Sequence, residues 1–208
     1  ACLAWSGQRP VAWLLDHAPV DARWCLVHAT HMDADEHRRA AASGAVAGVC
    51  PSTEANLGDG VFALPDWQGH AGVWGIGSDS HVAVDPAEDL MLLEYSQRLT
   101  AGRRNVAATP VQPAVATWLW LQAVAGGARA AARPVAGLAV GQQADLIVLD
   151  PDHPALAGLS PDPMLAGHVF ASSRSRAIES VWGGGRCRVR RGGHRGRGPA
   201  RQGFVEAR

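Results

Sequence analysis

Three short apolar segments, each followed by polar residues, constrain the fold of this chain most. They lie at 24–28, 45–50 and 73–77, and helical spacing follows the first at 33–40 and the third at 86–97. Short buried strands that alternate with helices are typical of parallel βα units. We expect the strand at 24–28 to be buried on both faces. Three such strands predict part of a (β/α)8 barrel, because a whole barrel needs about 250 residues.

The second half of the chain has a different pattern. An Ala-rich helix is expected over 117–132, where the Gly126-Gly127 pair weakens it. A turn and a β-branched strand follow over 137–150, and residues 169–182 have room for two more strands. We therefore predict an α/β fold: the last part of a (β/α)8 barrel at 1–134, a small β-sandwich-type domain at 135–185 and a Gly/Arg-rich tail at 186–208.

Composition and charge exclude several classes of partner. Nineteen basic residues balance nineteen acidic ones, so there is no general attraction to nucleic acid or to an acidic membrane. The Gly/Arg-rich tail could be a nucleic-acid segment, but it has no aromatic residue before Phe204 for stacking on bases, and we favour a disordered or degenerate end. No stretch is apolar enough to span a bilayer, and no secretory signal opens the chain. We expect a cytoplasmic protein in which Cys25 and Cys50 are reduced core thiols.

Two of the predicted strands end in residues that can carry chemistry. His28 follows the first strand and Asp79 follows the third. Strand ends form the active site of a (β/α)8 barrel. A carboxylate there can bind a divalent metal and move a proton, and a neighbouring imidazole can polarise the bond under attack. Each residue by itself is more often structural, so the pattern leaves the function open.

The resemblance to a known family narrows this choice. The segments 24–32, 43–51, 53–60 and 75–81 come in one order at close spacing, and 93–106 and 137–150 continue the match. They resemble the formimidoylglutamate deiminases of the amidohydrolase superfamily over about residues 1–185. The Thr-Glu-Ala-Asn-Leu-Gly-Asp-Gly segment at 53–60 is the most specific part.

The resemblance implies roles for individual residues. Asp79 corresponds to the metal-binding aspartate of the eighth strand, which also moves a proton, and His28 to the catalytic histidine of the sixth strand. Glu54 and Asn56 fall in a loop that faces the substrate, as substrate-binding or supporting groups. His31 is expected to be structural, and the role of His81 is left open. One zinc ion is implied, with its remaining ligands upstream of residue 1.

The implied reaction is hydrolysis of N-formimidoyl-L-glutamate, a small-molecule substrate, to N-formyl-L-glutamate and ammonia, by a homodimer when full length. The alternatives are another deaminase of the superfamily, acting on guanine, cytosine or an adenosyl compound, and a non-catalytic protein built on part of a barrel. The segment at 53–60 argues against the other deaminase, whereas the missing metal ligands favour the non-catalytic protein for this chain as it stands.

The chain departs from the family pattern in its metal ligands. The His-x-His pair of the first strand and the histidine of the fifth strand are absent, and His17 has no matching motif. We therefore expect a fragment that binds metal poorly and is inactive by itself, since zinc sites have at least three protein ligands. We also expect its unpaired strand edges to promote association.

Overall fold

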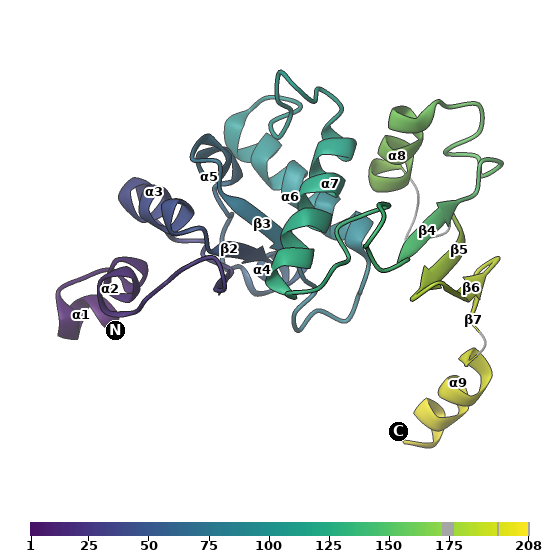
Figure 1. Ribbon diagram of the computed structural model, residues 1–208, viewed down its shortest axis with the longest axis horizontal. Coiled ribbons are helices and arrows are strands. Elements are labelled where there is room, and N and C mark those ends of the chain that lie inside the picture. Colours follow the sequence, from purple (N-terminus) through teal and green to yellow (C-terminus); the bar gives the residue numbers. More distant parts are fainter. Residues whose placement is uncertain (172–176, 195, 208) are drawn as a thin grey trace.

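Three short parallel strands form one sheet in the computed structural model, which describes residues 1–171, 177–194 and 196–207. The strand order is β1-β2-β3, with β1 at Cys25–Val27, β2 at Val46–Val49 and β3 at Val73–Ile76. Leu26 pairs with Ala47, which pairs with Trp74. Helices connect the strands in sequence (Figure 1), which confirms the predicted part of a (β/α)8 barrel.

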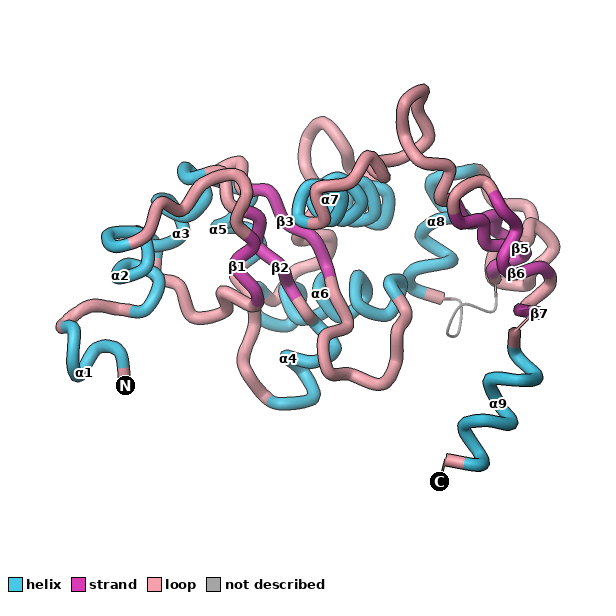
Figure 2. Tube along the Cα trace, turned by 60° about the horizontal axis from the view of Figure 1, so that its bottom comes forward, coloured by secondary structure: helices cyan, strands magenta, loops and turns pink. Residues whose placement is uncertain are grey.

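Helices surround this sheet and continue to the N-terminus. They are α1 (Cys2–Ser6), α2 (Pro10–His17), α3 (Ala34–Ser43), α4 (Pro51–Leu57), α5 (Leu64–Gly69), α6 (Pro86–Ala101) and α7 (Val115–Ala130). Helix α7 packs against β3 and β2, and Figure 2 shows it beside the sheet. Large buried side chains fill the space between these elements, including Phe62, Trp67, Trp74, Leu90, Leu93 and Leu119. Within the described residues, no helix is both long and apolar enough to cross a bilayer.

Gly126 lets α7 approach β3 closely. A Cβ atom at Gly126 would lie 1.7 Å from the carbonyl oxygen of Trp74, whereas a Cβ at Gly127 would have no neighbour within 4 Å outside the helix itself. The Gly126-Gly127 pair was expected only to weaken the helix. The structure shows that Gly126 is needed for packing, because only glycine permits this contact between the α7 and β3 backbones.

A second, antiparallel sheet follows in the order β4-β5-β6-β7. Its strands are β4 (Leu146–Leu149), β5 (Ile178–Gly183), β6 (Arg186–Arg190) and β7 (Gly193–His194). Helix α8 (Pro161–Phe170) packs against α6 and α7, where Phe170 stacks on Tyr95 with ring centroids 5.7 Å apart. The prediction of two strands over 169–182 is wrong for 169–170, which end α8. Residues 172–176 lie outside the described residues.

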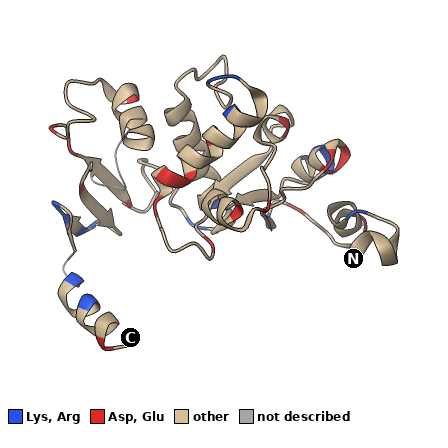
Figure 3. Cartoon of the chain, turned by 180° about the vertical axis from the view of Figure 1, so that it is seen from behind, with Lys and Arg blue, Asp and Glu red and all other residues tan. Residues whose placement is uncertain are grey.

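The Gly/Arg-rich tail is ordered where the structure describes it. Arg186, Arg188 and Arg190 are exposed and alternate with half-buried Cys187 and Val189 along β6. Helix α9 (Arg197–Glu206) follows, and Figure 3 shows the basic residues of both elements at this end of the molecule. The expected disorder is therefore wrong for β6, because a period of two lets the charges face water while the apolar side chains pack on β5. Two tail residues, 195 and 208, lie outside the described part, and the division at 134 and 185 stays a prediction.

Two further expectations about the barrel part are wrong. Strand β1 is not buried on both faces: Leu26 is buried, but Cys25 is exposed and Val27 is 57% exposed, so the face that carries Cys25 and Val27 is open to solvent in the described part of the chain. Cys25 is therefore not a core thiol. The expected loop at 51–60 begins with helix α4, which Pro51 starts and Gly58 ends in the left-handed conformation.

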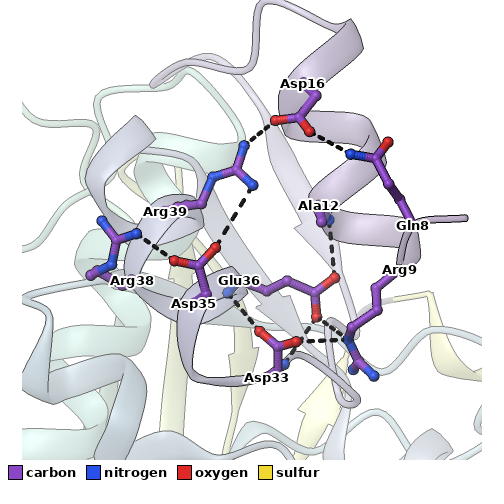
Figure 4. Close-up of polar contacts among 9 residues, drawn as sticks. All are labelled: Gln8, Arg9, Ala12, Asp16, Asp33, Asp35, Glu36, Arg38 and Arg39. Atoms are coloured by element: carbon purple, nitrogen blue, oxygen red, sulfur yellow. Dashed lines mark hydrogen bonds and ion pairs between the residues drawn. The ribbon is translucent and has the colours of Figure 1, made fainter.

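A polar network fastens α2 to α3 (Figure 4). Glu36, which is 2% exposed, accepts hydrogen bonds from Arg9 Nε at 2.8 Å, from the backbone of Ala12 at 3.0 Å and from the backbone of Asp33 at 2.9 Å. In turn, the Asp33 side chain accepts a hydrogen bond from the Glu36 N–H at 2.9 Å, which completes a capping box at the start of α3. Burial alone would raise the pKa of Glu36, but these hydrogen bonds and the charge of Arg9 outweigh burial and lower it.

Exchange of the two glycines of α7 tests the close contact with β3. Gly126→Ala is expected to lower the free energy of unfolding by about 1–3 kcal/mol or more, since the methyl group would overlap the Trp74 carbonyl. Gly127→Ala is the matched control and is expected to raise it by up to about 1 kcal/mol. Chemical denaturation of both variants measures this, and equal effects would contradict the packing role of Gly126.

The lowered pKa of Glu36 predicts a pH-dependent contribution to stability. A carboxyl group with a lowered pKa in the folded state stabilises fully above its unfolded pKa of about 4.3, and loses this contribution as the pH falls through the folded value. Glu36→Gln is therefore expected to be less stable at pH 7 by about 1–3 kcal/mol, with a smaller difference at low pH. Urea unfolding between about pH 7 and pH 3 measures this, and a difference that grows toward acid would refute it.

Candidate active site

The ends of the three parallel strands bring three donor side chains together. His28 directly follows β1, Cys50 directly follows β2 and Asp79 lies in the turn after β3. One ligand atom from each of them lies within 4.8 Å of the others. His28 Nε2 is 3.6 Å from Asp79 Oδ2, which is beyond a direct hydrogen bond but leaves room for a shared partner. The two residues predicted to be catalytic are therefore neighbours.

Both of these residues have backbones in the left-handed region. The φ angle is 65° at His28 and 46° at Asp79. Residues other than glycine adopt this conformation at a cost, and such residues gather at functional sites when their surroundings hold them. The His28 N–H donates to the Gly48 carbonyl at 2.8 Å, and the His81 N–H closes the turn around Asp79 on the Ser78 carbonyl at 3.0 Å.

Glu54 lies on the inner side of this cluster. Its Oε1 atom is 3.2 Å from His28 Nδ1 and accepts a hydrogen bond from the Cys50 N–H at 2.8 Å. The carboxyl group comes from the first turns of α4, which follows β2 without a loop, so the helix points it back to the strand ends. Burial raises the pKa of Glu54, and the hydrogen bonds from Cys50 and His28 only partly oppose that effect.

Thr53 holds the turn that carries Asp79. Its hydroxyl donates to the Ser78 carbonyl at 2.8 Å and accepts from the His81 N–H at 3.2 Å. Because Thr53 is 1% exposed, water does not compete for these bonds. Thr53 and Glu54 are adjacent in the same helix, so α4 fixes both Asp79 and His28.

Cys50 was predicted only as a core thiol, and it is buried, with 4% exposure. Burial raises its pKa to about 11, and the charges of Glu54 and Asp79 add to that effect. The thiol is therefore neutral at pH 7 unless a cation stabilises the thiolate. Its position at a strand end, between those that carry His28 and Asp79, was the signal in the sequence that it belongs to the site.

The donor set fits a divalent metal. An imidazole nitrogen, a carboxylate oxygen and a thiol sulfur are the three ligand types that zinc accepts from proteins. The Asp79 side chain is 43% exposed and the His28 side chain 37% exposed, so both can be reached by a small molecule.

The remaining residues singled out from the sequence lie elsewhere. Asn56 is exposed on α4, two residues after Glu54, and residues at that spacing do not share a helix face. His31 is exposed, and its carbonyl accepts a hydrogen bond from Arg9. The His81 ring accepts from the Ala83 N–H at 3.2 Å. His17 stacks on Trp13 in α2. The structure does not bring Asn56 to His28 or Asp79, and its substrate contact stays a prediction.

Comparison with known proteins identifies the class. Residues 7–188 match the model of the amidohydrolase family, and the chain belongs to this family. It is 48% identical over 205 residues to formimidoylglutamate deiminase of Pseudomonas aeruginosa, covering 99% of this chain and 45% of that protein. It is 28% identical over 179 residues to a 5-methylthioadenosine/S-adenosylhomocysteine deaminase of Shouchella clausii, covering 85% and 39%. The chain thus spans less than half the length of these curated relatives.

Solved structures agree with this assignment. An amidohydrolase from Brucella melitensis superposes with a TM-score of 0.92 at 45% identity, over 99% of this chain and 45% of that one. An adenosine deaminase from Xanthomonas campestris with bound zinc superposes with a TM-score of 0.82 at 23% identity, over 99% and 47%. The first similarity extends to sequence, and the second shows the shared fold.

Substitution of Thr53 tests whether α4 holds the turn that carries Asp79. Thr53→Val keeps the shape but removes both hydrogen bonds to the turn, and is expected to weaken zinc binding by the whole protein by about 10- to 100-fold. Thr53→Ser keeps the hydroxyl and is expected to bind zinc nearly as tightly as the unaltered protein. Zinc titration against a competing chelator measures both affinities. Equal losses in the two variants would show that the hydroxyl does not support Asp79.

Proposed function

We propose that the whole protein is a formimidoylglutamate deiminase, which hydrolyses the formimino C=N bond of N-formimidoyl-L-glutamate. The products are N-formyl-L-glutamate and ammonia. The observation that carries this proposal is the 48% identity to the Pseudomonas aeruginosa enzyme over 99% of the chain. The juxtaposition of His28 and Asp79 at the strand ends supports it independently.

The proposed metal is zinc, held by Asp79 with further ligands from outside these 208 residues. The donor chemistry of the site and the zinc in a structural relative support this choice. When bound, such a metal supplies a Lewis acid that lowers the pKa of water and polarises the bond under attack. Cys50 lies close enough to be an additional donor, although its raised pKa opposes this role.

The residues of this chain perform the proton and charge steps of the proposal. Addition of water to the formimino carbon builds up negative charge on a tetrahedral species, and His28 is positioned to stabilise it by donating from Nε2 once that nitrogen has gained a proton. The Asp79 carboxylate passes one proton of the attacking water to the imino nitrogen and then transfers the second from the new hydroxyl group, so that the C–N bond breaks, the formyl C=O bond forms and the nitrogen leaves as ammonia. The homodimer and the cytoplasmic location implied by the resemblance belong to this proposal, as does a substrate contact of Asn56.

Ammonia release by the whole protein tests the function. With N-formimidoyl-L-glutamate, guanine and S-adenosylhomocysteine compared side by side, we expect turnover of the first only. His28→Asn and Asp79→Asn are each expected to lower kcat/KM by about 100-fold or more. His17→Asn, on the exposed side of α2, is the matched control and is expected to leave kcat/KM unchanged.

Each other outcome has a distinct meaning. Turnover of guanine or S-adenosylhomocysteine in place of formimidoylglutamate would assign another deaminase, and no turnover of any substrate would favour a non-catalytic protein. The 208-residue chain alone is expected to bind zinc below one equivalent and to be inactive. Stoichiometric zinc and turnover by that chain would show that His28, Cys50 and Asp79 suffice.

A further inference from the structure

We infer that Glu54 is a positioning residue for His28: it holds the imidazole proton on Nδ1 and leaves Nε2 directed at Asp79. This role deepens the proposed function and rests on it for its kinetic consequence. The sequence placed Glu54 in a loop facing the substrate, as a substrate-binding or supporting group. The geometry connects it to the reaction through the His28 ring.

The hydrogen bonds around Glu54 Oε1 determine which ring nitrogen carries the proton. The Cys50 backbone N–H can only donate, so Oε1 accepts at 2.8 Å, and an ionised Glu54 carboxylate can only accept from its other neighbours as well. The same oxygen faces His28 Nδ1 at 3.2 Å. If Nδ1 had no proton, two lone pairs would oppose each other at this distance. A proton on Nδ1 satisfies both atoms, and the neutral ring then has its lone pair on Nε2.

Exposure places Glu54 behind the histidine. The Glu54 side chain is 5% exposed, whereas those of His28 and Asp79 are 37% and 43% exposed. Glu54 also borders a cavity of about 360 Å³ lined mainly by apolar side chains such as Phe62 and Leu93, and neither His28 nor Asp79 borders that cavity. A carboxylate in this position orients the ring from within, as the outer groups of metal and catalytic sites do.

Two helical constraints keep the Glu54 carboxylate in place. Its own helix starts at Pro51, and the Glu54 side chain reaches back to the Cys50 N–H at the start of that helix. The neighbouring Ser52 N–H donates to Asp89 of α6 at 3.0 Å, which ties the same turn to a long helix. The acceptor is therefore preorganised and does not have to be ordered when substrate binds.

Three variants of Glu54 separate positioning from other roles. Glu54→Gln keeps an acceptor oxygen of the same reach and is expected to retain most of kcat. Glu54→Leu removes the acceptor and is expected to lower kcat by about 10- to 100-fold with little change in KM. Glu54→Asp withdraws the acceptor by one methylene group and is expected to lie between them, so it replaces Glu54→Leu if the latter does not fold.

The decisive readout is the tautomer of His28 in the whole protein. Histidine labelled with ¹⁵N reports the protonated nitrogen by long-range ¹H–¹⁵N correlation, at a pH where the ring is neutral, and the His28 signals are assigned by their loss in His28→Gln. We expect the Nδ1–H form in the unaltered protein and in Glu54→Gln, and a gain of the Nε2–H form in Glu54→Leu or Glu54→Asp. An Nε2–H form in the unaltered protein, or an Nδ1–H form that persists without the acceptor, would overturn the inference.

Glu94 provides the matched control. It is a fully buried glutamate of α6 that accepts hydrogen bonds from the backbones of Val106 at 2.9 Å and Ala107 at 3.1 Å, away from His28. Glu94→Gln is expected to reduce stability without altering the His28 tautomer or kcat. Since the tautomer is measured without substrate, its result stands whether or not formimidoylglutamate is turned over, so failure of the inference and failure of the proposed function are distinguishable.

Discussion

The parallel register of the three-stranded sheet is the constraint on which the rest of this site depends. Because β1, β2 and β3 run in the same direction, their carboxyl ends meet at one edge, and His28, Cys50 and Asp79 converge there. A slip of one residue between two strands would turn alternate side chains to the opposite face. The close contact of Gly126 with Trp74 fixes α7 on this sheet.

Helix α4 holds the side chains at this edge of the sheet in place. Three consecutive residues in its first turns make polar contacts with other elements. The Ser52 N–H donates to Asp89, and the Thr53 hydroxyl donates to the turn that carries Asp79. The Glu54 carboxylate lies beside the His28 ring. Burial raises the pKa of Asp89 as it does that of Glu54, so both carboxyl groups depend on their hydrogen bonds inside the protein. The most family-specific segment of the sequence, at 53–60, begins in this helix.

Membership of the amidohydrolase family and the geometry of the strand ends support one chemistry by separate routes. The family match covers residues 7–188, and the 0.92 TM-score to the Brucella melitensis amidohydrolase extends it to three dimensions. The chain contributes a carboxylate and an imidazole to a site whose donor types suit zinc. In Figure 1, the antiparallel sheet β4–β7 lies on the other side of α7 from the parallel sheet. Helix α8 connects the two parts by packing against α6 and α7.

The sequence by itself determined the local elements and the order of the strand ends. Apolar periodicity indicated β2, β3 and α6, and the motif resemblance identified His28 and Asp79, because both signals depend on neighbours in the chain. Only the tertiary structure placed Cys50 beside them and put Glu54 behind His28. It also left one face of β1 exposed. These features depend on contacts between residues about 25 positions apart and on which strands have neighbours, and such contacts leave no period in the sequence.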